Sequence, residues 1–128
     1  MYNEYAKSIA KLFKWNSTIL IRTHYLLKDY LMDKKVSSLV KSKNIDAVFY
    51  TIENDRDRWS QTSSINHAHL LVKGRNITKE VVSKGLNINP KAVIGIEEIR
   101  GQKAITSYIT KSMSKSSIFY SNIKLVKK

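Results

Sequence analysis

The sequence predicts an α+β protein in which helices pack on an antiparallel sheet, and three observations lead to this class. The chain has 128 residues, 42% of them hydrophobic, which suits a single core. Apolar and β-branched runs of strand length recur along it, and amphipathic segments of helical period lie between most of them. No repeat or low-complexity linker interrupts the pattern, so residues 1–128 are expected to form a single domain.

The first part of the chain is predicted to supply two helices and a strand. Residues 1–15 are expected to form an N-terminal amphipathic helix packed on the domain. Residues 17–23 are β-branched and apolar, which favours a strand. Residues 25–41 carry leucines and a tyrosine among lysines and are expected to form a helix that lies on the sheet. The apolar stripe expected on the N-terminal helix consists of Tyr2, Tyr5, Ile9, Leu12 and Phe13.

The middle of the chain is predicted to form a long β-hairpin. Residues 46–53 and the aliphatic residues 65–72 are the two expected strands. Residues 54–64 between them are polar and charged, so they are expected to form the hairpin tip.

The last part is predicted to add two helices and two strands. Thr78 is a typical N-cap, residues 79–84 are expected to be helical, and Gly85 is the expected stop. The remaining elements are a strand at 92–100, a helix at 103–115 and a strand at 117–126. A first helix followed by β-α-β-β-α-β-α-β describes a ferredoxin-like sandwich, close to the RNA-recognition fold.

Charge and composition restrict the function. Lys and Arg number 23 against 10 Asp and Glu, which gives a net charge of +13 and a pI near 10.0. Such an excess favours nucleic acid as a partner, and the basic residues are too evenly spread for one membrane-surface helix. The absence of cysteine excludes disulfides, thiolate catalysis and cysteine-ligated zinc. Without a membrane-length apolar run or a signal-peptide core, we expect a soluble, intracellular protein with no membrane partner.

Two histidines stand in the predicted strand 65–72. Because side chains alternate along a strand, His67 and His69 share a face and offer two imidazole ligands to a divalent metal. If the hairpin strands pair about their tip, Glu53 falls near both and completes a three-ligand site with open positions. The alternatives are that the histidines only line a half-buried sheet face and that Glu53 is a solvated residue at a strand end.

The predicted helix 103–115 carries the second set of candidates. Tyr108, Lys111 and Lys115 follow i, i+3, i+7 spacing and share a face. Nearby ammonium groups favour the phenolate, which can attack phosphorus, while a lysine can hold a phosphate oxygen. The alternative is that Tyr108, one of seven tyrosines, is an ordinary core or surface residue.

Together the two motifs carry a resemblance to a known family. His67-Ala68-His69 on a strand, followed about forty residues later by Tyr108-Ile109-Thr110-Lys111 on a helix, resembles the HUH endonuclease superfamily. More narrowly, the chain is similar to the replication initiators (Reps) of rolling-circle viruses, phages and plasmids. The strand at 18–23 stands where the loosely defined first motif of that family lies. The resemblance covers residues 17–126 and implies the HUH endonuclease fold.

The resemblance implies a metal-dependent nickase and ligase that acts on single-stranded DNA at a replication origin. Tyr108 would attack the scissile phosphate, forming a 5′-phosphotyrosine link and releasing a 3′-hydroxyl. His67 and His69, with Glu53, would hold Mg²⁺ or Mn²⁺, and Lys111 would position phosphate or assist proton transfer. The expected location is the cytoplasm of a host cell. A helicase and a polymerase would come from the host or another protein, because the sequence has no Walker motif; a homodimer is left open.

The chain departs from the family at the third metal ligand. Many Reps place an acidic residue a few positions before the histidines, but residues 59–64 contain none. Glu53 is therefore the preferred candidate for the third metal ligand, and Asp55, Asp57 and Glu97 are the alternatives. His24 is interpreted as structural. Only one tyrosine lies on the motif helix, so a two-tyrosine mechanism is not expected.

Two other functions stay open. An HUH transposase of the insertion-sequence type would use the same chemistry, although Tyr-x-x-Lys is more typical of a Rep. A non-catalytic ferredoxin-like module would bind nucleic acid by stacking bases on Phe49, Tyr50 and Trp59.

Overall fold

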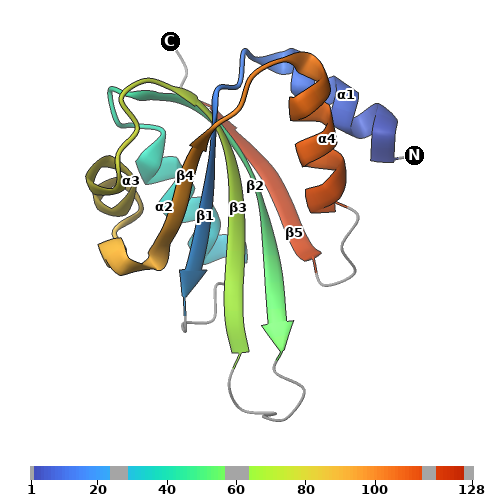
Figure 1. Cartoon of the computed structure of the whole chain (residues 1–128). Helices are drawn as coiled ribbons and strands as arrows, with labels where there is room; N and C mark the ends of the chain where they lie inside the picture. Colours follow the sequence, from blue (N-terminus) through green and yellow to red (C-terminus); the bar gives the residue numbers. More distant parts are fainter. Residues whose placement is uncertain (1, 24–28, 57–63, 114–117, 126–128) are drawn as a thin grey trace.

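The computed structural model describes residues 2–23, 29–56, 64–113 and 118–125. They form a five-stranded antiparallel sheet in the order β4-β1-β3-β2-β5, with helices on both faces (Figure 1). The predicted α+β class with packed helices is confirmed. Within the described residues, no helix is long and apolar enough to cross a membrane. The elements are α1 (Tyr2–Leu12), β1 (Ser17–Thr23), α2 (Asp29–Leu39), β2 (Ile45–Arg56), β3 (Ser64–Gly74), α3 (Lys79–Leu86), the 3₁₀ turn η1 (Pro90–Ala92), β4 (Val93–Glu98), α4 (Gln102–Met113) and β5 (Ile118–Leu125).

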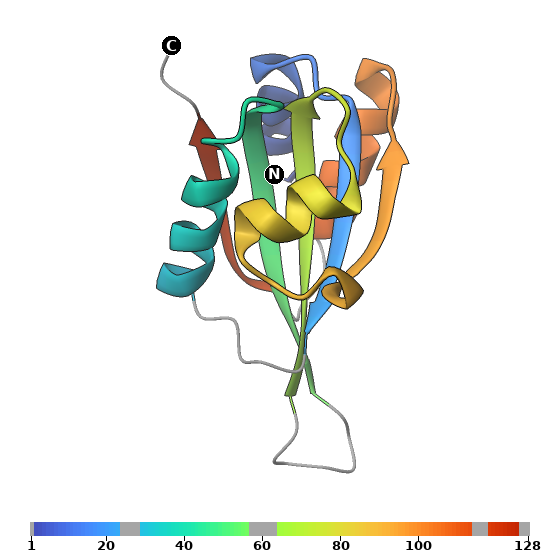
Figure 2. The same ribbon diagram turned by 90° about the vertical axis from the view of Figure 1, so that its left-hand side faces the viewer.

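One face of the sheet is covered by α2 and α3, which Figure 2 shows in front of the strands. The strands contribute alternate residues to this core, because only every second side chain of a strand points to a given face. Tyr50 and Ile52 come from β2, and Ala68, Leu70 and Val72 from β3; all five are fully buried. The helices contribute apolar residues at helical spacing: Met32, Val36 and Leu39 from α2 and Val82 and Leu86 from α3.

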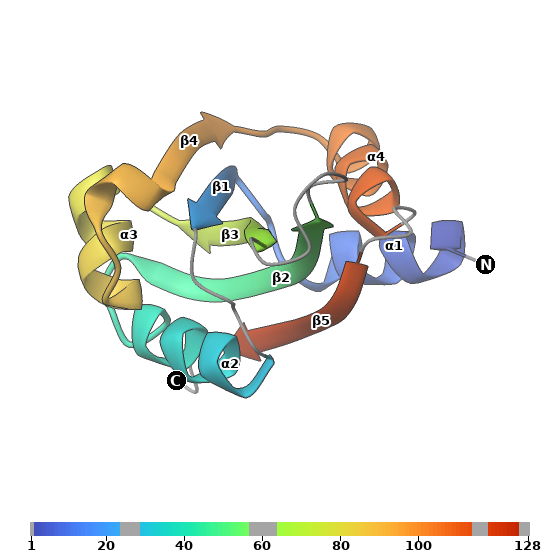
Figure 3. The same cartoon turned by 90° about the horizontal axis from the view of Figure 1, so that it is seen from below.

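The opposite face is covered by α1 and α4 (Figure 3). Phe49 and Leu71, which alternate with the residues of the first core, pack here against Ile105 and Ile109 of α4. Trp15 follows α1 into the same core, where its indole N–H donates a hydrogen bond of 2.8 Å to the carbonyl of Ile9. This α1/α4 face carries the candidate site described below.

The N-terminal helix packs on the domain as predicted, but through a different stripe. Tyr5 is 43% exposed and Leu12 55% exposed, whereas Ala6 and Ala10 are buried together with Ile9. A helix that lies against another helix favours small residues where the backbones come close, which explains why Ala6 and Ala10 are buried while Tyr5 and Leu12 are exposed.

The hairpin strands are longer than predicted. β2 continues to Arg56 and β3 begins at Ser64, so part of the expected tip is paired strand. The last pairs join Asn54 to Asn66, Asp55 to Ile65, and Arg56 to Ser64. Strand pairing is made by backbone groups and does not require apolar side chains, so the polar pattern did not reveal it.

The stop of α3 differs from the prediction. Thr78 is the N-cap, and its hydroxyl accepts a hydrogen bond of 3.2 Å from the Val81 N–H. Gly85 lies inside the helix, where a Cβ atom would come within 2.6 Å of Leu39 Cδ1. Its role is therefore to let α3 approach α2. The left-handed residue that ends the helix is Asn87, with φ 55°.

Candidate functional site

The two histidines lie on the α1/α4 face of the sheet. His67 and His69 alternate in β3 with Ala68 and Leu70, which are fully buried in the core on the other face. They therefore share their face with Leu71, which packs under α4. Both histidines are half-buried.

The register of the sheet fixes the neighbours of the histidines. His67 pairs with Glu53 in β2 and with Arg22 in β1. His69 pairs in the same way with Thr51 and Leu20. Directly paired residues of antiparallel strands have Cβ atoms about 4.5–5.5 Å apart. Position 53 is thus next to His67, where the expected pairing of the hairpin put it.

The substitute carboxylates lie farther from the histidines or outside the described residues. Asp55 pairs with Ile65, two residue pairs beyond the Glu53–His67 pair. Glu97 is exposed on β4, and β1 separates β4 from the histidine strand β3. Glu97 pairs with Thr18 of β1, and Thr18 pairs with Leu71 of β3, so Glu97 lies at the level of Leu71. Asp57 falls outside the described residues, as does His24. Of the carboxylates considered, Glu53 has the position that best fits a shared site.

The donor set can be compared with the ligands that divalent metals prefer. Among the side chains that the structure describes, no three His, Cys, Asp or Glu residues lie close enough together to hold a metal ion. The side chain of Glu53 is not among those described. Two imidazoles with a paired carboxylate position suit a divalent ion with mixed nitrogen and oxygen ligands. They suit Mn²⁺ better than Mg²⁺, which prefers oxygen ligands.

A buried hydroxyl lies beside this donor set. Thr51 is fully buried, and its Oγ1 has no hydrogen-bond partner among the described residues. Thr51 pairs directly with His69. A buried polar atom without a partner is costly, so this hydroxyl fits a site that receives a water molecule or ligand group when it is filled.

The candidate nucleophile lies on the same face of the sheet. Tyr108 is half-buried on α4 and packs against the core formed by α1, α4 and the strands beneath them. α4 starts at the end of the sheet where β4 finishes and runs back toward the end where β2 finishes and β3 begins (Figure 1). Tyr108 is six residues into this path, about 9 Å along the helix from Gln102. The fold therefore brings α4 and its tyrosine onto the face that carries His67 and His69.

The structure describes one of the two candidate lysines of the predicted helix 103–115. Lys111 is exposed on α4, three residues after Tyr108, so it lies on the same side of the helix. Lys115 falls outside the described residues.

Arg22 is a candidate that the sequence did not single out. It is exposed and pairs directly with His67, and its side chain makes no hydrogen bond or ion pair with any residue that the structure describes. Paired residues share a face, so its guanidinium belongs to the same surface as the histidines. The only sequence signal was an arginine near the end of an otherwise apolar strand.

The aromatic residues proposed for base stacking are not accessible. Phe49 is 2% exposed in the core beneath α1 and α4, and Tyr50 is 0% exposed in the core beneath α2 and α3. Stacking on these two residues is therefore ruled out as a mode of nucleic-acid binding. Trp59 falls outside the described residues.

Comparisons of the chain with protein-family models, with curated proteins and with solved structures find no match. The function is therefore inferred from the residues and their placement.

Proposed function

We propose that this chain is a metal-dependent nickase and ligase for single-stranded DNA, of the HUH replication-initiator type, which starts rolling-circle replication at an origin. The observation that carries the proposal is the gathering of its parts on one sheet face. A histidine pair on β3, a carboxylate position and an arginine beside it, and a tyrosine on the helix above belong to that face. A net charge of +13 fits a DNA substrate.

The strand order supports an HUH-type, ferredoxin-like arrangement. The unit β1-α2-β2-β3-α3-β4 has both of its helices on one face, as a split β-α-β sandwich requires. In such a sandwich the face of the sheet opposite these two helices would be exposed to solvent. Here α1 and α4 cover part of it, and α4 brings the tyrosine.

Tyr108 performs the covalent step. Its Oη attacks the scissile phosphorus, a new O–P bond forms, and the bond from phosphorus to the 3′ oxygen of the preceding nucleotide breaks. The phenol loses its proton, and the departing 3′ oxygen takes one up and becomes a hydroxyl. The 5′ phosphate stays on the tyrosine. Attack by a 3′-hydroxyl reverses the step and rejoins the strand without ATP, because the number of phosphodiester bonds is conserved.

Arg22 and Lys111 hold the phosphate during this exchange. Both are exposed cations, one on the sheet beside His67 and one on the helix beyond Tyr108. Charge-assisted hydrogen bonds to the non-bridging oxygens orient the phosphorus toward the phenol and stabilise charge that grows in the transition state. His67, His69 and Glu53 would hold a divalent cation, either Mn²⁺ or Mg²⁺, which would supply positive charge at the same phosphate.

The reaction implies the partners of the protein. Origin DNA must be single-stranded when it reaches the site, so a helicase and a polymerase of the host or of another protein complete replication. The proposed location is the host-cell cytoplasm, and a homodimer would place two such sites on one origin.

The test is adduct formation on a denaturing gel. The protein is incubated with a sequence-diverse pool of labelled single-stranded oligonucleotides and Mn²⁺, with and without EDTA. We expect an SDS-resistant protein–DNA adduct that requires the metal and is lost in Tyr108→Phe. Tyr5→Phe is the matched control, because it removes a phenol hydroxyl from an exposed position on α1. An adduct that persists in Tyr108→Phe, or DNA binding without any adduct in the unmodified protein, would contradict the proposal.

A further inference from the structure

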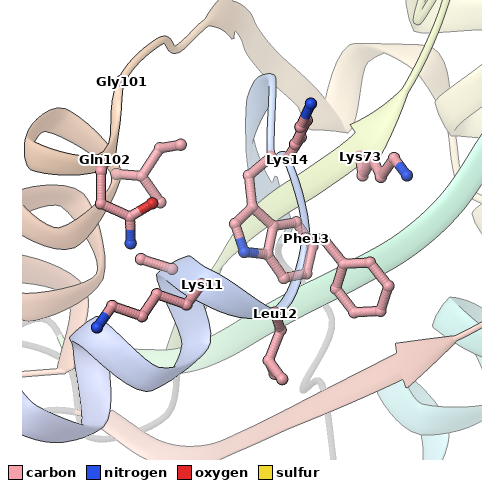
Figure 4. A pocket seen from close by; sticks show the side chains of 10 residues that line it. Lys11, Leu12, Phe13, Lys14, Lys73, Gly101 and Gln102 are labelled. Carbon is pink, nitrogen blue, oxygen red and sulfur yellow. The ribbon is translucent and has the colours of Figure 1, made fainter.

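A pocket lined by lysines lies on the α1/α4 face of the sheet, near the C-terminal end of β3. It has a volume of about 620 Å³ and opens where the end of α1, the end of β3 and the start of α4 meet (Figure 4). Of its ten lining residues three are lysines, namely Lys11, Lys14 and Lys73, and none is acidic. Lys11 and Lys14 belong to the end of α1 and the residues after it, whereas Lys73 comes from β3, so the fold brings the third lysine to the other two.

The charge of this pocket is not balanced by the protein. None of the three lysines makes an ion pair within the part of the chain that the structure describes. Another pocket of similar size, about 550 Å³, is lined by Arg75 and Arg100 but also by Glu97 and Glu98. There Arg100 and Glu98 form an ion pair of 3.3 Å. Like charges gathered without a counter-charge repel one another, and an anion relieves the repulsion.

An aromatic side chain completes the lysine pocket. Phe13 is half-buried, and its ring contacts Trp15 edge to face, with centroids 5.3 Å apart and an angle of 71° between the rings. Trp15 is itself buried and fixed by its hydrogen bond to Ile9. The Nζ atom of Lys73 lies 6.0 Å from the centroid of the Phe13 ring. A fixed aromatic ring beside ammonium groups matches a nucleotide, which presents a flat base next to a phosphate.

We propose that this pocket binds one nucleotide of the single-stranded DNA, at a position distinct from the cleaved bond. Its phosphate lies between Lys14 and Lys73, and its base stacks on Phe13. The identity of the strand as DNA rests on the proposed function. Lys73 follows His69 by four residues of β3, about 13 Å along the strand, so the bound nucleotide is a few positions away from the scissile phosphate.

The experiment measures binding separately from cleavage. Fluorescence anisotropy of a labelled oligonucleotide is recorded without metal, with Lys14→Gln/Lys73→Gln and with Phe13→Leu. The matched control is Lys79→Gln/Lys84→Gln, which removes two exposed charges from α3 on the other face of the sheet. Thermal melts of every variant establish that it is folded.

The two pocket variants are expected to respond differently to salt. The lysine pair should weaken binding about tenfold or more and reduce the slope of log K against log salt by about 0.7, since the contact with one phosphate is lost. Phe13→Leu should weaken binding at least about fivefold and leave the slope unchanged, because stacking is uncharged. The control pair should change neither quantity by more than a small fraction of these effects.

The outcomes separate this proposal from the proposed function. Equal losses of affinity in the lysine pair and in the control pair would show that binding depends only on the net charge of the protein. That result would contradict a nucleotide site in the pocket. Unchanged binding in Phe13→Leu would overturn the nucleotide as its ligand. Adduct formation is measured in parallel, and a protein that forms no adduct but shows the predicted binding losses refutes the nickase while the pocket stands.

Discussion

The role given to Arg22 leads to a prediction that neither the histidine motif nor the tyrosine motif makes. Arg22→Gln removes the guanidinium and keeps a polar side chain at the end of the row formed with His67 and Glu53. The Arg22 side chain is exposed and makes no hydrogen bond or ion pair with a described residue, so the substitution should change the free energy of unfolding by less than about 0.5 kcal/mol. Any large effect on activity is then not a folding effect.

The expected magnitude follows from the exposure of the side chain. A hydrogen bond to a charged partner contributes about 1.5–3 kcal/mol, and Arg22 belongs at the lower end because water screens it. About 1.5 kcal/mol in the transition state corresponds to a rate of adduct formation about tenfold lower. Arg22→Lys should restore part of that loss, since it keeps the charge but not the two-pronged geometry of the guanidinium.

The assay is single-turnover adduct formation with the oligonucleotide at saturating concentration. The matched control is Arg75→Gln, which removes an arginine charge from the exposed turn after β3, at the other end of that strand. If Arg22→Gln reacts at the same rate as the unmodified protein, or if Arg75→Gln is slowed equally, the reasoning from register to phosphate binding is wrong.

Three further predictions concern the metal ligands and the helix packing. Glu53→Gln should raise the Mn²⁺ concentration needed for half-maximal adduct formation at least about tenfold, whereas Glu97→Gln, two strands away from β3, should not; a metal titration checks this. Adduct formation should need less Mn²⁺ than Mg²⁺, because two of the three proposed ligands are imidazoles, and equal requirements in parallel titrations would argue against a histidine site. Gly85→Ala should lower the free energy of unfolding by about 1–3 kcal/mol in urea titrations, because its Cβ would lie 2.6 Å from Leu39 Cδ1 and 3.2 Å from Leu39 Cα; an unchanged midpoint would mean that α2 and α3 can separate at no cost.

Local features of the fold were predictable from the sequence. The alternation in β3 indicated that His67 and His69 share a face, because the period of a strand is fixed by its backbone. Thr78 was recognisable as an N-cap because capping depends on residues within one turn of each other. The proximity of Glu53 to the histidines was expected from the hairpin, because antiparallel pairing about one turn brings the facing strand residues together, and the observed register pairs it with His67.

Features that depend on distant segments were not predictable in this way. The position of Arg22 beside His67 depends on which strand lies next to β3, and nothing in residues 17–23 specifies that neighbour. Gly85 was interpreted as a helix stop, but its real constraint is Leu39, more than forty residues earlier. The burial of Ala6 and Ala10 in place of Tyr5 likewise follows from the approach of α4, which the sequence of α1 does not contain.

The alternation of β3 explains how one strand can serve both stability and the proposed chemistry. Ala68, Leu70 and Val72 point to the core under α2 and α3 and are fully buried, so they hold the strand in register. The residues between them face α1 and α4, where Leu71 anchors the helix that carries the tyrosine while His67 and His69 stay half-buried. A shift of one residue in register would exchange the two sets and bury imidazoles in the apolar core. The buried set therefore fixes the positions of the histidines relative to Arg22, Glu53 and α4, which is the rigidity that a phosphoryl-transfer site requires.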